Sequence, residues 1–317
     1  MERKTTVGGQ AVIEGVMMRG KKGIATAIRK SNGEIAVDIK ESVSFSKRNK
    51  ILSLPIIRGF VTLIESLIVG INTLNYSASF FEETEENSSS KFDKWFEGIF
   101  KDKSNDVLMG ISLFISIGVA VLLFFILPTI SANVFKRLGV YNTIELNIIE
   151  GIIRVAIFLI YIYAIGKMED INRVFQYHGA EHKTIFCYEN YKELTPENAK
   201  EFERFHPRCG TNFLFLVMIV SIVLFSLTGW SSLWQRILYR IILLPLVSGL
   251  TYELIKWIGI SNSIIAKIIS YPGLTLQKLT TREPDYEQLE VAIKALKLAE
   301  GIEKSPVIQD SLISEME

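Results

Sequence analysis

One segment of this 317-residue chain contains all three of its histidines and both of its cysteines: Gln176-Tyr177-His178-Gly179-Ala180-Glu181-His182-Lys183, then Cys187, then His206-Pro207-Arg208-Cys209-Gly210. Histidine and cysteine are the side chains best suited to bind zinc. His178 and His182 are four residues apart, so on a helix both imidazoles project from the same face. We therefore predict a zinc site held by His178, His182, His206 and Cys209.

Glu181 lies on the same helix face and completes the motif His-x-x-Glu-His, the inverzincin order in which the Glu is a general base. Two kinds of zinc site stay open: a structural site closed by four protein ligands, or a catalytic site with three ligands and a water. Without a metal, the histidines are ordinary polar residues of an amphipathic helix and Cys209 is a small buried apolar residue. Cys187 turns to the opposite side of the helix and is not predicted as a ligand.

The hydrophobic residues, 49% of the chain, gather in four segments of about the 20 residues that a helix needs to cross a bilayer. The segments are 107–127, 146–166, 212–230 and 237–258. The first contains 21 residues without a charge and ends before Pro128. We predict a polytopic α-helical membrane protein with about four transmembrane helices.

Charged residues inside these segments predict two ion pairs. Glu150 and Arg154 are four residues apart, and Glu253 and Lys256 are three apart, so each pair can meet on one helix face. Charges at this depth are candidates for function. Because both pairs lie toward a segment end, we interpret them as structural pairs at the membrane interface.

The distribution of basic residues predicts the topology. Residues 167–212 carry seven Lys and Arg, whereas residues 128–145 carry two. By the positive-inside rule we expect the 167–212 loop and both termini in the cytoplasm, with the lipid bilayer as the protein's surroundings. Cysteines in a cytoplasmic loop stay reduced, which favours a metal ligand over a disulfide. The net charge of +1 gives no reason to expect a nucleic-acid partner.

Residues 1–50 predict a small β-rich cytoplasmic domain. The runs 23–29 and 34–40 flank Ser31-Asn32-Gly33, a strong hairpin signal. The run 7–19 is also strand-like and is broken by glycines. Its polar residues Gln10, Glu14 and Arg19 are either ordinary surface-strand residues or partners that orient the metal ligands.

Between this domain and the first span, residues 51–106 predict an amphipathic helix and a charged linker. The helix, 55–74, is apolar with helical periodicity, and a fifth span would carry the N-terminal domain across the membrane. We therefore expect it to lie in the membrane interface. The linker, 82–106, contains a short aromatic helix at 92–100. The transmembrane region, 107–258, includes the metal-site loop, and 259–317 forms cytoplasmic helices, one of them at 286–300, and a tail.

Three stretches together resemble the YqhQ-like bacterial membrane proteins: Gly8-Gly9-Gln10-Ala11-Val12-Ile13-Glu14-Gly15-Val16-Met17-Met18-Arg19, Tyr177-His178-Gly179-Ala180-Glu181-His182-Lys183, and His206-Pro207-Arg208-Cys209-Gly210-Thr211. Leu279-Thr280-Thr281-Arg282-Glu283-Pro284 and the Glu290-Val291-Ala292-Ile293 that follows are similar to that family as well. The family has no established function, and its members are described as predicted metal-dependent enzymes. The resemblance implies a bacterial inner-membrane protein with a metal site, and it implies no substrate.

Two functions fit these features. In the first, a closed zinc site clamps the loop of a scaffold or accessory factor for another membrane protein or complex. In the second, a zinc-dependent membrane hydrolase uses Glu181 as its general base. The sequence favours the scaffold slightly, because no further catalytic residue is apparent. A transporter is a weaker third hypothesis, because no broken helix or inverted repeat is visible.

Overall fold

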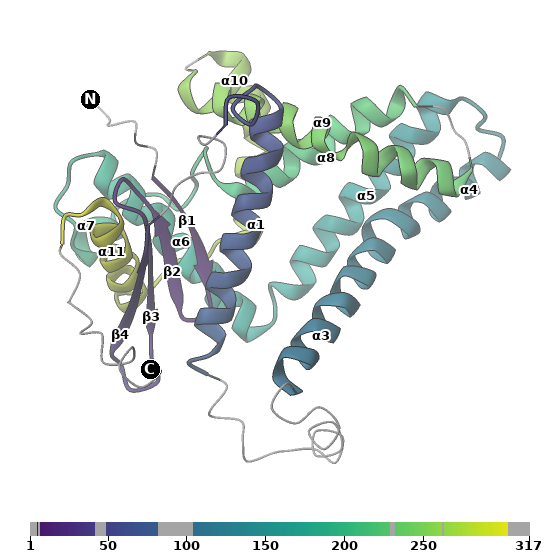
Figure 1. The fold of residues 1–317 in the computed structure, drawn as a ribbon. Coiled ribbons are helices and arrows are strands. Elements are labelled where there is room, and N and C mark those ends of the chain that lie inside the picture. The colour runs from purple at the N-terminus through teal and green to yellow at the C-terminus, as the bar shows by residue number, and fades with distance from the viewer. Residues whose placement is uncertain are drawn as a thin grey trace.

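The computed structural model places a small domain of strands and helices at one end of an elongated set of apolar helices (Figure 1). It describes Thr5 and residues 7–41, 49–81, 104–228, 232–261 and 263–303. The predicted linker helix at 92–100 lies outside the described residues.

Four antiparallel strands, paired in chain order, form the N-terminal sheet: β1 (Gly8–Val12), β2 (Gly15–Arg19), β3 (Ile24–Arg29) and β4 (Ile35–Lys40). The predicted hairpin is confirmed between β3 and β4, and Gly33 in its turn has a φ of 88°, which glycine adopts without steric cost. The run 7–19 forms two strands instead of one, because the chain turns back at Ile13-Glu14.

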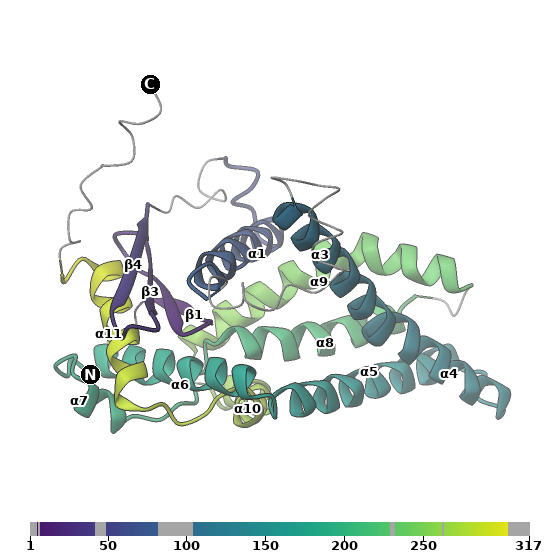
Figure 2. The ribbon, with the colours of Figure 1, turned by 90° about the horizontal axis from the view of Figure 1, so that it is seen from below.

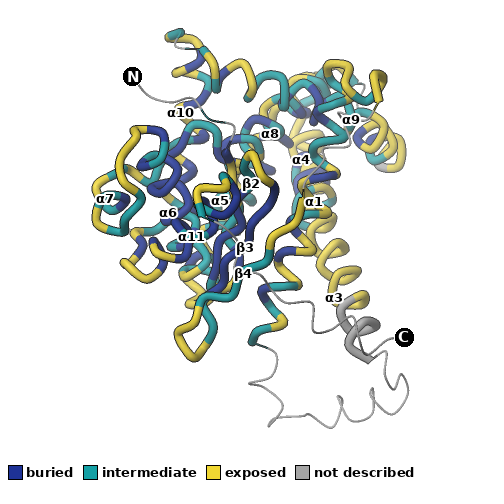
Figure 3. The backbone as a smooth tube through the Cα atoms, turned by 60° about the vertical axis from the view of Figure 1, so that its left-hand side comes forward, coloured by how far each residue is buried: buried dark blue, intermediate teal, exposed yellow. Residues whose placement is uncertain are grey.

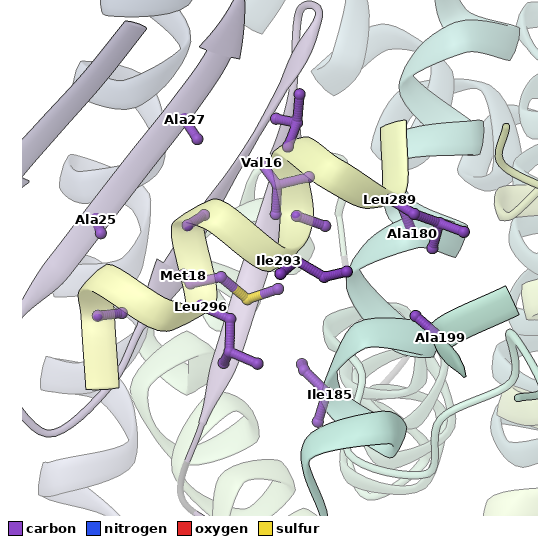
Figure 4. Packing of buried hydrophobic residues seen from close by; sticks show 14 of the residues in the cluster. Val16, Met18, Ala25, Ala27, Ala180, Ile185, Ala199, Leu289, Ile293 and Leu296 are labelled. Atoms are coloured by element: carbon purple, nitrogen blue, oxygen red, sulfur yellow. The ribbon is translucent and has the colours of Figure 1, made fainter. Parts of the chain in front are cut away.

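Helices from the second half of the chain complete this N-terminal domain. Helix α11 (Tyr286–Glu300) packs on β2 and β3, and α6 (Glu169–Glu189) packs on α11 and β1. The short helix α7 (Pro196–Lys200) lies against both. Figure 4 shows the shared core, which includes Val16, Met18, Leu289 and Leu296. Each large aliphatic side chain buried there contributes about 1.5–3 kcal/mol relative to an exposed one.

The other helices are rich in apolar residues: α1 (Ile57–Ala78), α3 (Ser104–Val121), α4 (Leu127–Arg137), α5 (Thr143–Ile165), α8 (Gly210–Ser226), α9 (Leu233–Ile260) and α10 (Ile264–Thr280). A π-helical turn, η5 (Leu122–Ile126), joins α3 to α4. Four described stretches are long and apolar enough to cross a membrane: Ile57–Ala78, Gly110–Arg137, Thr143–Ile165 and Trp234–Ile260. Three correspond to predicted spans, α1 is the fourth, and α8 is shorter, with 17 residues. From Gly110 on, the residues of α3 are exposed (Figure 3), and most of them are apolar.

The first predicted span continues beyond its expected end at Pro128, through η5 and α4 to Arg137. Pro128 has no N–H to donate to the carbonyl of Phe124, four residues earlier. Arg154 of α5 compensates, because its Nε donates to the Phe124 carbonyl at 3.0 Å. A partner helix therefore satisfies the backbone group that the proline leaves free.

Glu150 joins three helices through a buried network of charges. Its predicted pair with Arg154 is confirmed at 2.7 Å, and it also binds Arg236 and Arg240 of α9. Glu150 is only 1% exposed, so this is a buried network and not the interfacial pair that we expected. Thr129 of α4 extends it, donating to Glu150 and accepting from Arg240.

Helix α1 runs across the direction of α5, α8 and α9, which lie alongside one another (Figures 1 and 2). It packs closely on α9, since a Cβ at Gly59 would lie 2.8 Å from the Cα of Gly249. Arg58 donates two hydrogen bonds to Glu253 of α9, at 2.5 and 2.6 Å. This ion pair replaces the predicted pair of Glu253 with Lys256.

Candidate metal site

His178 and His182 lie on α6, and His206 and Cys209 lie in the loop that leads into α8. Helix α6 is continuous, so His178 and His182 lie one turn apart on the same face. Its first turn contains Glu169 and Asp170, and acidic residues stabilise this positive end of a helix. Cys209 is the N-cap of α8, with an extended backbone and its Sγ accepting from the Thr211 N–H at 3.4 Å. The sulfur is therefore held where the chain enters an apolar helix.

Three of the four predicted ligands come together. The ligand atoms of His178, His182 and Cys209 all lie within 4.8 Å of one another. His178 Nε2 is 3.1 Å from Cys209 Sγ, and the two imidazole centroids are 4.5 Å apart. Zinc–ligand bonds of about 2.0–2.3 Å in a tetrahedron separate ligand atoms by about 3.3–3.8 Å. These side chains need only small shifts to satisfy that geometry.

Backbone carbonyls fix the tautomers of the two histidines. His178 Nδ1 donates to the carbonyl of Thr280 at 2.9 Å, and His182 Nδ1 donates to the carbonyl of Arg204 at 2.5 Å. A carbonyl oxygen only accepts, so each Nδ1 carries a proton and each neutral ring keeps a lone pair on Nε2. Histidines that bind metals are usually oriented in this way.

His182 presents a buried nitrogen to the cluster without a conventional partner. Its Nε2 is inaccessible to solvent and makes no hydrogen bond in the described part of the chain. Burial lowers the pKa of His182, which favours the neutral ring. A buried polar atom left unpaired costs about 1–3 kcal/mol, a cost that a bound metal would remove. The donor set of two imidazoles and one thiol is one that zinc accepts.

His206, the fourth predicted ligand, lies beside the cluster. Its ring centroid is 5.6 Å from that of His182, and its Nε2 is 3.7 Å from the carboxylate of Glu189. Its Nδ1 accepts from the Arg208 N–H at 3.3 Å. Both backbone groups of His206 are bound by the side chain of Gln277, each at 2.7 Å. His206 therefore anchors the loop that ends in Cys209.

A cavity of ≈430 Å³ adjoins the cluster, and all three grouped residues line it. Glu181 is on the same wall and is 5% exposed. The backbone of Gly9 in β1 approaches it closely: a Cβ at Gly9 would lie 3.0 Å from Glu181 Cδ. Burial raises the pKa of Glu181, although His178 and the Gly9 N–H act in the opposite direction. A Cβ at Gly9 would also lie 2.5 Å from the backbone oxygen of Met17, so only glycine fits between β2 and the carboxylate without a shift of the backbone.

The polar residues of the first strand-like run all contact neighbouring elements. Gln10 lines the cavity, and Glu14 forms a two-bond ion pair with Arg173 of α6. Arg19 pairs with the buried Glu65 of α1 at 2.5 Å. These contacts fix α1 and α6 against the sheet on two sides of the cavity.

The segment after α10 supports the site through backbone atoms. Gly179 of α6 lies directly against this segment, since a Cβ there would lie 2.1 Å from the carbonyl oxygen of Arg282. The carbonyls of Thr280 and Arg204 orient the histidines, yet the sequence assigned them no role. Every residue has a backbone carbonyl, so the residue types at these positions do not indicate which carbonyl accepts a hydrogen bond from a histidine. The Leu279–Pro284 motif pointed to this segment without indicating how it acts.

Two comparisons place the chain in a family. Residues 54–301 match a family described as "Protein of unknown function (DUF1385)". The chain is also 36% identical over 296 residues to the "Uncharacterized protein YqhQ" of Bacillus subtilis (strain 168), a match that covers 91% of this chain and 90% of that protein. No solved structure shows significant similarity to the chain. The resemblance to YqhQ-like proteins is thereby confirmed, and the chain belongs to the DUF1385 family.

Proposed function

We propose that this protein is a membrane-bound zinc hydrolase whose metal is held by His178, His182 and Cys209. The observation that carries the proposal is that three ligand atoms converge on the wall of a ≈430 Å³ cavity that Glu181 also lines. Catalytic zinc sites have three protein ligands and an open position, whereas structural sites are closed by a fourth ligand. A zinc ion there would supply a Lewis acid at the cavity.

Glu181 is the proposed proton carrier. It follows His178 by three residues, so its side chain leaves α6 on the face of the ligands. Its carboxylate accepts from the Gly9 N–H of the sheet, which holds it on the cavity wall. A carboxylate within reach of the reacting water is the usual general base of zinc hydrolases.

The scaffold function remains a second candidate because of one observation. His206 lines the same cavity, with its ring centroid 5.6 Å from that of His182. If His206 exchanged its contact with Glu189 for the metal, four ligands would close the site. A closed site would then clamp the loop of an accessory factor for another membrane protein.

We further propose that the α3–α4 rod, α5, α8 and α9 cross the bacterial inner membrane, with both termini in the cytoplasm. The sheet, α6 and α11 share contacts, so they lie on one side of the bilayer. The chain must therefore cross an even number of times between the sheet and α6, where α1, the rod and α5 are the described helices that intervene. Of these, α1 has the lowest mean hydropathy, 1.5, against 2.7 for the rod and 2.2 for α5. An even number of crossings requires that one of these three helices does not cross, and its low hydropathy supports α1 as that helix.

The metal site is tested by elemental analysis of the purified full-length chain. We expect about one zinc per chain and its loss in Cys209→Ser, since the thiolate is a ligand. The matched control is Cys187→Ser, which changes a buried cysteine whose Sγ instead contacts the carbonyl of Glu193 at 3.4 Å. A chain without transition metal, or a Cys209→Ser variant that retains it, contradicts the proposal.

A cobalt-substituted form separates the two candidate functions, because visible cobalt bands respond to coordination. An open site predicts that acetohydroxamate shifts these bands and that His206→Ala keeps its metal. A closed site predicts unchanged bands and metal loss in His206→Ala. Glu181→Gln preserves hydrogen bonding but cannot act as a base, so it should keep the metal in both cases and abolish activity only in a hydrolase.

A further inference from the structure

Helix α1 faces the protein with polar residues and exposes an apolar side. Glu65, Thr73 and Ser77 are buried. The exposed set, 38–53% accessible, consists of Ile57, Ile64, Leu67, Ile68, Ile71 and Leu74. At 3.6 residues per turn the two sets lie on opposite sides of the helix. A surface helix in water has the reverse arrangement, with its apolar stripe toward the core.

Two further residues indicate how deep this apolar side lies. Near the C-terminal end of α1, the exposed side also carries Asn72 and Asn75. Polar residues at the end of an apolar stripe suit a helix at the surface of a bilayer, where one side meets acyl chains and the ends meet water.

Helix α10 repeats the pattern on another side of the site. Ser270, Gln277 and Thr280 are buried, together with the apolar Ala266 and Leu276. The exposed side, 58–74% accessible, carries Ile264, Ile265, Ile268 and Tyr271. Two helices that bury polar residues and expose an apolar side therefore lie beside the metal site.

Both helices also form part of the metal site. Ser66 of α1 lines the ≈430 Å³ cavity and an adjoining cavity of ≈230 Å³. Helix α10 provides the Thr280 carbonyl that orients His178. Figures 1 and 2 show α1 crossing near the ends of α8 and α9, beside the sheet. The cavity therefore borders the surface on which the apolar side of α1 is exposed.

We infer that the substrate of the proposed enzyme is a bilayer lipid, whose head group enters the cavity while its acyl chains stay along α1. The inference rests on the proposed function. An exposed apolar helix side of this size is unfavourable in water, so something apolar must contact it. Helices α3, α5 and α9 expose apolar residues of the same kind. Acyl chains cover all of these surfaces at once, which a protein partner of one helix would not.

The size of the cavity and the chemistry agree with this substrate class. Ligand pockets span about 300–1,000 Å³, so ≈430 Å³ accepts a lipid head group but not its acyl chains. Hydrolysis of one lipid ester adds the hydroxyl of water to the acyl or phosphoryl group and its proton to the released alcohol. No other reactant is required.

Photo-crosslinking of the full chain in vesicles of phosphatidylethanolamine and phosphatidylglycerol tests this inference. One probe is a phosphatidylethanolamine with a diazirine on its head group, and the other carries the diazirine in an acyl chain. We expect acyl-chain adducts on the exposed side of α1 and head-group adducts on the cavity wall. Ser66→Trp should reduce the cavity adducts about fivefold by filling the opening. Ile68→Trp, which lies about 160° around the α1 axis from Ser66 on the exposed apolar side, should leave them unchanged.

The outcomes separate this inference from the proposed function. Adducts on α1 without head-group adducts in the cavity overturn the lipid substrate, and so do equal cavity adducts in the two tryptophan variants. If Ser66→Trp does not fold, the positions of the acyl-chain and head-group adducts on the wild-type chain decide whether the lipid head group enters the cavity. The labelling does not require metal, so it is repeated with His182→Ala. Cavity adducts that persist in His182→Ala support the lipid site independently of the metal, and a wild-type chain that shows these adducts but contains no zinc by elemental analysis refutes the zinc hydrolase alone.

Discussion

Gly179→Ala should weaken metal binding without touching a ligand. The added Cβ would lie 2.1 Å from the Arg282 carbonyl oxygen, so that carbonyl must move by about 0.9 Å to restore a 3.0 Å contact. Overpacking of this kind costs about 1–3 kcal/mol. Alanine returns about 1 kcal/mol through its higher helix propensity. We therefore expect a net loss of about 0–2 kcal/mol in the free energy of unfolding.

The effect on the metal should be larger than the effect on stability. The displaced segment also carries the Thr280 carbonyl, which orients His178. Losing an outer partner of a ligating histidine typically lowers metal affinity about 10–100-fold. Zinc affinity measured by competition with a chelator, alongside thermal unfolding of the metal-free protein, separates the two effects.

Gly210→Ala provides the control for this change. Gly210 is adjacent to Cys209 as Gly179 is to His178, but an added Cβ there meets nothing within 4 Å. Its zinc affinity should match that of the wild type. Equal affinities for Gly179→Ala, Gly210→Ala and the wild type would refute the role of the Arg282 segment in holding the site.

Three other predictions follow from the fold. Glu150→Gln leaves three buried arginines without their carboxylate and should cost about 3–5 kcal/mol in thermal unfolding, whereas Glu145→Gln, at an exposed position on the same helix, should cost almost nothing. Burial alone raises the pKa of Glu300, but hydrogen bonds from Tyr188 and Lys21 lower it overall. The ionised Glu300 carboxylate therefore stabilises the fold above its pKa in the unfolded chain, about 4.3, and this stabilisation is lost as the pH falls below that value. Glu300→Gln should reduce this part of the pH dependence of the melting temperature. Reporter fusions at Asn32 and Asn198 should both report the cytoplasm, and an external Asn32 with an internal Asn198 would show that α1 crosses.

Features that depend on local sequence could be predicted. The β3–β4 hairpin follows from Asn32-Gly33, and α11 follows from its periodic apolar residues and the capping box of Asp285 and Gln288. Helix α6 and its paired histidines follow from spacing alone. The grouping of His178, His182 and Cys209 was predictable because these residue types are so rare in the chain.

Features that depend on contacts between distant segments could not be predicted. The helix continues past Pro128 because Arg154 satisfies the free carbonyl, and no local rule indicates that partner. Glu253 pairs with Arg58, which is distant in sequence, and not with the nearby Lys256. His206 contacts Glu189 because the side chain of Gln277, on α10, hydrogen-bonds the backbone of His206 and fixes its position. Each case is decided by tertiary packing, which spacing along one helix cannot show.

The position of Cys209 fits the location that we propose for the site, at the surface of a bilayer. Cys209 caps α8, and the next residue begins an apolar helix, so the sulfur is fixed at the level where the chain leaves the polar domain. The histidines lie on α6, which packs on the sheet and α11. A shift of α8 by one turn along its axis, about 5.4 Å, would separate the sulfur from both imidazoles. Metal binding would therefore depend on the correct depth of α8 relative to the N-terminal domain. A site acting on soluble molecules has no need of that dependence, whereas one acting on lipid head groups requires its ligands at a fixed depth.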